Sequence, residues 1–71
     1  MNPRFSVGER VYASRGLGVS PELGTVAGMK ARAKTTQGME PGVEVIFARD
    51  GERRTFWGAA AGMVEAARDA A

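Results

Sequence analysis

The side chains most often used in catalysis are absent from this chain of 71 residues, which contains no histidine and no cysteine. A disulfide, a thiolate nucleophile, an imidazole base and a zinc site of the usual kind are therefore excluded. Acid–base chemistry would fall to the eight carboxylates, the two lysines and Tyr12. Their spacing shows no paired carboxylates for a metal and no glycine-rich phosphate loop. The sequence favours a non-catalytic protein without metal or cofactor, with an enzyme as the weaker alternative.

The residues best suited to carry a function are basic. Residues 23–39 contain three cations and no acid, and a second group of cations follows at residues 53–54. If the first stretch is an extended ribbon, its three cations lie on one side, because side chains alternate along a strand. Such groups contact phosphate oxygens without reading base sequence. We therefore predict a nucleic-acid-binding surface, with a merely solvated surface as the alternative. Its residues are Lys30, Arg32, Lys34, Arg53 and Arg54.

Two consecutive aromatic residues, Phe56 and Trp57, would point to opposite faces of a strand, one into the core and one outward. An outward aromatic beside Arg53 or Arg54 would form a stacking platform or a cation–π clamp. The alternative is that Trp57 fills the end of a barrel or an interface between subunits. A second functional hypothesis is therefore a protein-binding adaptor or oligomerisation module. Its contact patch would contain Tyr12, Val19 and Trp57.

The elements that position these residues are short strands, because glycine and proline interrupt brief apolar runs. Strands are predicted over residues 9–14, 24–30, 43–48 and 53–57, with an Asp-Gly turn between the last two. Residues 31–42 read as a long polar connection that ends in a Pro-Gly turn. After residue 58 we expect one helical turn and a short closing strand, with a longer helix as the alternative. These elements predict an all-β fold, a five-stranded antiparallel barrel with a long loop between its second and third strands.

Length and composition bound the assembly. The chain is 44% hydrophobic and 25% charged with a net charge of +2, which is typical of one soluble domain, with its core at about residues 5–67. A domain this short is marginally stable without disulfides or metals, so we expect a homo-oligomer. The strand at 43–48 is apolar on both faces, as in a central or interface strand.

No signal peptide or membrane-spanning run is seen, so we expect a cytoplasmic protein without a membrane partner.

Three short motifs, FSVGERVY (residues 5–12), LGTV (23–26) and VEVIF (43–47), resemble small SH3-like barrels of the Tudor or KOW kind. In such domains a helical turn and a short last strand follow. The C-terminal Tudor-like domains of some helicases show a similar arrangement and contact polymerase or nucleic acid. The resemblance therefore implies a barrel architecture and a role in nucleic-acid processing, while the long stretch 31–42 departs from the family pattern.

Residues 8–14 are also similar to the start of the type II plasmid-borne dihydrofolate reductase, a small barrel that is active as a tetramer around a central pore. That resemblance implies a third hypothesis, a pore-type homotetrameric reductase. The positions that carry the family's pore chemistry differ here. They are occupied by Ala13, Thr55 and Trp57.

Overall fold

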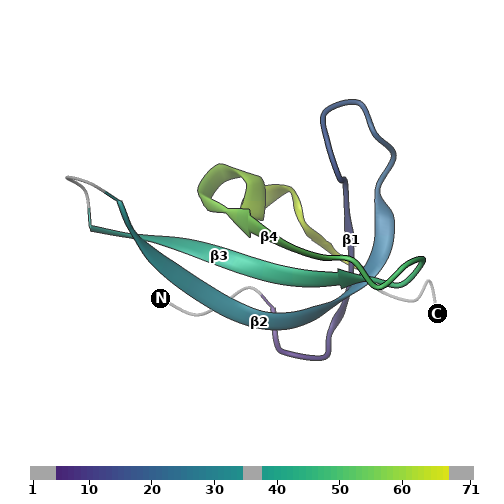
Figure 1. The fold of residues 1–71 in the computed structure, drawn as a ribbon, viewed down its shortest axis with the longest axis horizontal. Coiled ribbons are helices and arrows are strands. Elements are labelled where there is room, and N and C mark those ends of the chain that lie inside the picture. Colours follow the sequence, from purple (N-terminus) through teal and green to yellow (C-terminus); the bar gives the residue numbers. More distant parts are fainter. Residues whose placement is uncertain (1–4, 35–37, 68–71) are drawn as a thin grey trace.

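The chain folds into one antiparallel sheet of five strands, as a computed structural model of residues 5–34 and 38–67 shows (Figure 1). The strands are β1 (Arg10–Ala13), β2 (Glu22–Lys34), β3 (Gly38–Phe47), β4 (Arg53–Trp57) and β5 (Glu65–Ala66), and a 3-10 helix, η1 (Gly58–Met63), lies before β5. The strand order is β4-β3-β2-β1-β5, so β4 and β5 form the two edges of the sheet. The predicted five-stranded antiparallel architecture is confirmed, and so is the helical turn before a short last strand.

One face of the sheet carries the core. Along β3 the buried side chains are every second residue, Val43, Val45 and Phe47, which is the two-residue period of a half-buried strand. Val11 and Ala13 of β1, Val26 of β2, Val64 and Phe5 complete the buried set. Phe56 packs against the core from β4, and its ring meets that of Phe47 edge to face at a centroid distance of 6.2 Å. β3 is an interior strand between β2 and β4, which is one of the two placements that its apolar sequence allowed.

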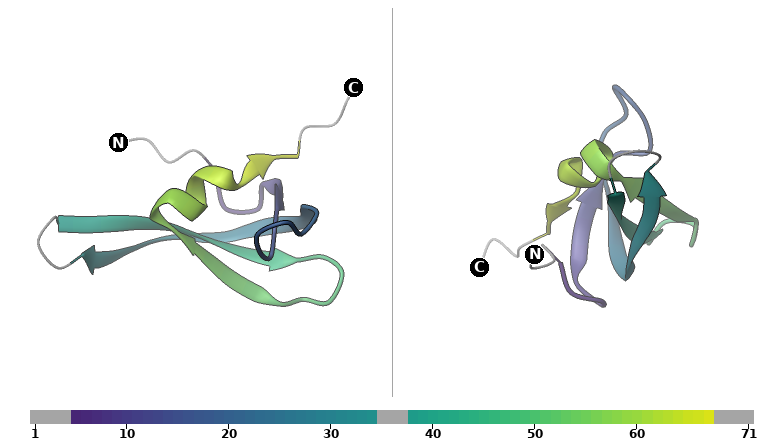
Figure 2. Two further views of the ribbon diagram at one scale, coloured as in Figure 1. Left: turned by 90° about the horizontal axis from the view of Figure 1, so that it is seen from above. Right: turned by 90° about the vertical axis from the view of Figure 1, so that its left-hand side faces the viewer.

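The long connection predicted over residues 31–42 is wrong, because most of that stretch is strand. β2 continues to Lys34 and β3 starts at Gly38, with Ala31 opposite Pro41 and Arg32 opposite Glu40. The hairpin of β2 and β3 consequently reaches beyond the other elements (Figures 1 and 2). Alanine, lysine, glycine and proline are poor strand formers, so pairing with the opposite strand, rather than propensity, keeps this part extended.

Backbone hydrogen bonds hold the turn between β3 and β4 and the edge strand β5 in place. The Gly51 backbone has φ of 75° and its N–H donates to the Phe47 carbonyl at 2.8 Å, which turns the chain from β3 into β4. β5 pairs with β1 through Val11 and Tyr12, and the Ala67 N–H donates to the Arg10 carbonyl at 2.9 Å. Among the described residues no helix has the length and apolar character needed to cross a bilayer.

Candidate functional site

The face of the sheet opposite the core, which we call the outer face, brings three predicted cations close together. The register places Lys30, Gly42 and Trp57 in one row across β2, β3 and β4. Glu44 lies in the next row, and Arg53 lies opposite Ile46 in the row beyond it. Arg32 stands opposite Glu40 on the hairpin. Three of the five predicted basic residues, Lys30, Arg32 and Arg53, therefore share one face.

The cations of the outer face cover its carboxylates. The Glu44 carboxylate lies 3.7 Å from Lys30 Nζ and 3.9 Å from Arg53 Nη1. The Glu44 side chain is 17% exposed, whereas those of Lys30 and Arg53 are 47% and 65% exposed. Glu40 is likewise less exposed than the cation with which it pairs. Its side chain is 15% exposed, whereas that of Arg32 is 53% exposed. An incoming ligand therefore meets the positive groups first, and the carboxylates hold those groups in place from below.

Arg32 and Trp57 form a stack on this face. The Arg32 guanidinium carbon lies 4.3 Å from the centroid of the Trp57 ring, and Nε donates to Glu40 Oε1 at 2.8 Å. The indole lies against Gly42, where an added Cβ would come within 2.6 Å of Trp57 Cε3. One of the two consecutive aromatic residues is expected to point outward, and this residue is Trp57. Its cationic partner is Arg32, which is 25 residues away along the chain, rather than Arg53 or Arg54.

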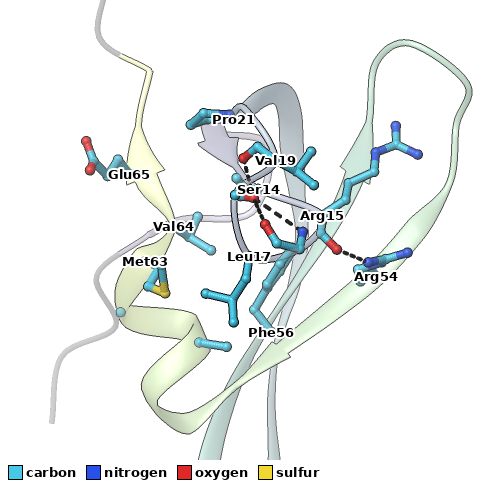
Figure 3. Close-up of a pocket in the computed structure, with 15 residues that line it drawn as sticks. Ser14, Arg15, Leu17, Val19, Pro21, Arg54, Phe56, Met63, Val64 and Glu65 are labelled. Atoms are coloured by element: carbon cyan, nitrogen blue, oxygen red, sulfur yellow. Dashed lines mark hydrogen bonds between the residues drawn. The ribbon is translucent and has the colours of Figure 1, made fainter.

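Arg54 lies on the opposite face of the sheet from these three cations, so the predicted basic residues do not all share one face. It lies opposite Val45, on the core side of β4, because consecutive strand residues point to opposite faces. Its Nη1 donates to the Arg15 carbonyl at 2.6 Å (Figure 3). Its Nη2 donates to Glu52 Oε2 at 3.0 Å. Lys34 ends β2 opposite Gly38, and its side chain lies outside the described part of the structure.

Arg15 ties the loop between β1 and β2 to the turn between β3 and β4. Its guanidinium pairs with Glu22, Asp50 and Glu52, and it lies over the Phe47 ring at 4.2 Å. The hydrogen bonds from Arg15 hold the pKa of the Asp50 carboxyl well below its usual value, and the Glu52 N–H adds to the effect. The same contacts raise the pKa of Arg15 further. This cluster is structural, since every charge in it faces an opposite charge of the same chain.

The lowered pKa of Asp50 makes the loop anchor sensitive to acid. A carboxyl whose pKa is lower in the folded state stabilises the fold above its ordinary pKa of 3.8, and the contribution is lost as the pH falls through the folded value. We expect Asp50→Asn to be less stable than the wild type at neutral pH, with a difference that shrinks below about pH 4. Urea denaturation of both proteins at a series of pH values measures this difference in the free energy of unfolding. A difference that stays constant with pH would contradict this role of Asp50.

A second feature is an apolar groove of about 740 Å³ beside η1. Figure 3 shows Leu17 from the loop after β1, Phe56 from β4 and Met63 from η1 around the same space. Leu17 is 97% exposed, and Val19 and Met63 are also exposed. Val19 lies in this groove as a predicted contact residue, whereas Tyr12 and Trp57 do not line it. The predicted patch of Tyr12, Val19 and Trp57 is therefore not a single surface around this groove.

Sequence reasoning missed Leu17, Met63 and Arg15. Leu17 stands alone between two glycines, and an isolated apolar residue in a loop gives no periodic signal. Two of the three acidic partners of Arg15, Asp50 and Glu52, lie 35 and 37 residues away, so the local sequence does not indicate them. The three positions singled out by the reductase resemblance are divided, because Ala13 is buried in the core while Thr55 and Trp57 lie on the outer face.

A scan against protein-family models finds no matching family, and searches of curated proteins and of solved structures find no match.

Proposed function

We propose that this chain is a non-catalytic interaction module, a small SH3-like barrel in architecture, that binds nucleic acid through the outer face. The observation that carries the proposal is the layering of charge, in which the exposed cations Lys30, Arg32 and Arg53 cover the carboxylates Glu40 and Glu44. Exposed cations on a sheet contact phosphate oxygens of any base sequence. The succession of strands, with a helical turn before the short last strand, supports the barrel architecture that the resemblance implies.

The charge layering also sets the expected mode of binding. Glu44 lies within 3.9 Å of both Lys30 and Arg53, so these side chains are partly ordered before a ligand arrives. Ordering long side chains costs free energy, and a surface that has already ordered them binds with a smaller penalty. Because the attraction is mainly between charges, binding weakens steeply as the salt concentration rises.

Removing the three outer-face cations should abolish most of the binding. Each phosphate contact contributes about 0.7 to the slope of log affinity against log salt for a single strand, so Lys30→Ala, Arg32→Ala and Arg53→Ala together should lower that slope by about 2. Since such contacts contribute little near 1 M salt, the triple variant should bind about 100-fold more weakly at about 0.1 M. Fluorescence anisotropy of labelled DNA and RNA oligonucleotides, measured over a salt series, checks both values.

The matched control is Arg49→Ala. Arg49 is an exposed cation in the turn after β3, where it pairs with Glu22, away from the outer face. Arg49→Ala removes one positive charge, as does each single substitution on the outer face. It should leave the affinity for the oligonucleotide within about twofold of the wild type. Equal losses for Arg49→Ala and for a single outer-face variant would mean that net charge, not this face, binds the ligand. No binding by the wild type to any oligonucleotide at low salt would overturn the proposal.

A second candidate function is a protein-binding or self-association module. The observation in its favour is the groove beside η1, where Leu17, Val19 and Met63 expose apolar side chains. Exposed apolar patches of this kind on a small domain mark contact sites for other proteins or for a second copy. The outer face and the groove lie on opposite sides of the sheet. One experiment that locates the bound ligand therefore distinguishes the two proposed functions.

A further inference from the structure

We infer that the ligand of the outer face is a single-stranded nucleic acid, and that one of its bases stacks on the Arg32 guanidinium. The inference rests on the proposed function and adds the substrate class and a base-contacting residue. It starts from the Arg32–Trp57 stack, which the attraction of phosphates alone does not require. A cation that serves only as a counter-charge needs neither a ring beneath it nor a fixed orientation.

Arg32 is held in one orientation before a ligand binds. Its guanidinium carbon is 4.3 Å from the Trp57 ring centroid, and its Nε donates to Glu40 at 2.8 Å. These two contacts fix both the position of the guanidinium and the direction of its donor edge. An arginine ordered in this way gives a flat surface at little further cost in side-chain entropy.

The guanidinium is nevertheless accessible. The Arg32 side chain remains 53% exposed with both contacts in place. Arginine planes, like aromatic rings, stack on unpaired bases, and a ring behind the guanidinium extends the stack. The site is therefore a platform in which Trp57 supports Arg32 and Arg32 meets the base. It differs from the simpler expectation that the indole itself would stack on the base.

Lys30, a cation that can contact a phosphate, lies close to Arg32 on the same face. Lys30 is two residues before Arg32 on the same face of β2, roughly 7 Å away along the strand. One nucleotide can therefore place its base on Arg32 while the adjoining backbone contacts Lys30, and Arg53 continues the positive surface beyond Glu44. A duplex cannot use the platform in this way, because its bases are already paired and stacked on one another.

The test compares two oligonucleotides of equal length and charge, one of deoxythymidine and one made only of abasic sites. The wild type should bind the base-bearing strand about fivefold to tenfold more tightly, the lower range for one stacked base. Arg32→Lys keeps the charge but loses the flat donor group, so it should bind both strands with equal affinity. Arg32→Ala should in addition weaken binding to the abasic strand. Arg49→Lys is the matched control and should retain the preference.

Each outcome decides a separate point. If the wild type binds both strands equally and with strong salt dependence, the base contact is wrong while the proposed function stands. If Arg32→Lys keeps the full preference, the base stacks elsewhere and the inference is overturned. If the wild type binds neither strand, the inference fails together with the proposed function. Circular dichroism of each variant confirms that the sheet is intact.

Discussion

Phe47→Ala should strongly destabilise the fold. Phe47 is fully buried at the centre of the core, where its ring meets Phe56 on one side and the Arg15 guanidinium at 4.2 Å. Truncating a buried phenylalanine costs about 3–5 kcal/mol. A domain of this length is stabilised by about 4–11 kcal/mol, at about 0.05–0.15 kcal/mol per residue. The variant therefore loses about a quarter or more of its free energy of unfolding, and at the lower limit of stability it loses nearly all of it.

Urea denaturation followed by circular dichroism measures this loss. The matched control is Ile46→Ala, one residue earlier on the same strand, where the side chain points to the outer face and stays partly exposed. We expect a clearly smaller loss there, because less apolar surface leaves the interior. Equal losses for the two variants would mean that the two faces of β3 contribute equally to the core, contrary to the observed alternation.

Gly42→Ala should displace Trp57 and disable the platform without removing a charge. A Cβ at Gly42 would come within 2.6 Å of Trp57 Cε3 and 2.8 Å of Cζ3, so the indole must move away from β3. We expect a loss of about 1–3 kcal/mol in the free energy of unfolding, as for other overpacked sites. Trp57 is the only tryptophan, so a shift of the emission maximum reports the movement directly. The preference for a base-bearing strand should fall as it does for Arg32→Lys.

The control for Gly42→Ala is the same substitution at Gly28. This glycine also faces outward, opposite Glu44, but the nearest atom to an added Cβ is a carboxylate oxygen of Glu44 at 4.0 Å. Gly28→Ala should therefore leave the emission of Trp57 and the preference for bases unchanged. If Gly42→Ala also leaves both unchanged, the indole is not held by its contact with Gly42.

The hairpin of β3 and β4 was the most predictable part of the fold. Val43, Val45 and Phe47 belong to a run of β-branched and aromatic residues, and Gly51 allows the turn, so the local sequence alone specifies the element. The last part of β2, residues 31–34, was not predictable in this way, because its alternating small and charged residues have low strand propensity. Its extended structure depends on pairing with residues 38–42, which is a non-local interaction.

The candidate site was predictable only in part, for the same reason. Alternation correctly groups Lys30 with Arg32, and applied to Arg53 and Arg54 it shows that only one of the two can face outward. What the sequence does not contain is the register between strands. That register places Trp57 beside Lys30 and Arg32, and it sets Glu40 and Glu44 beneath the cations. Neither the stack nor the charge layering follows from a local motif.

The central claim is that ligands bind to the outer face. The most direct test is a titration of the ¹⁵N-labelled chain with a short deoxythymidine strand, followed by NMR. The proposal predicts shifts in the amides of Lys30, Arg32, Gly42 and Arg53 and in the indole N–H of Trp57, all reversed by salt. The amides of residues 16–19 and 62–64 around the groove should stay in place. Shifts confined to those groove residues, or no shifts at all, would contradict the claim.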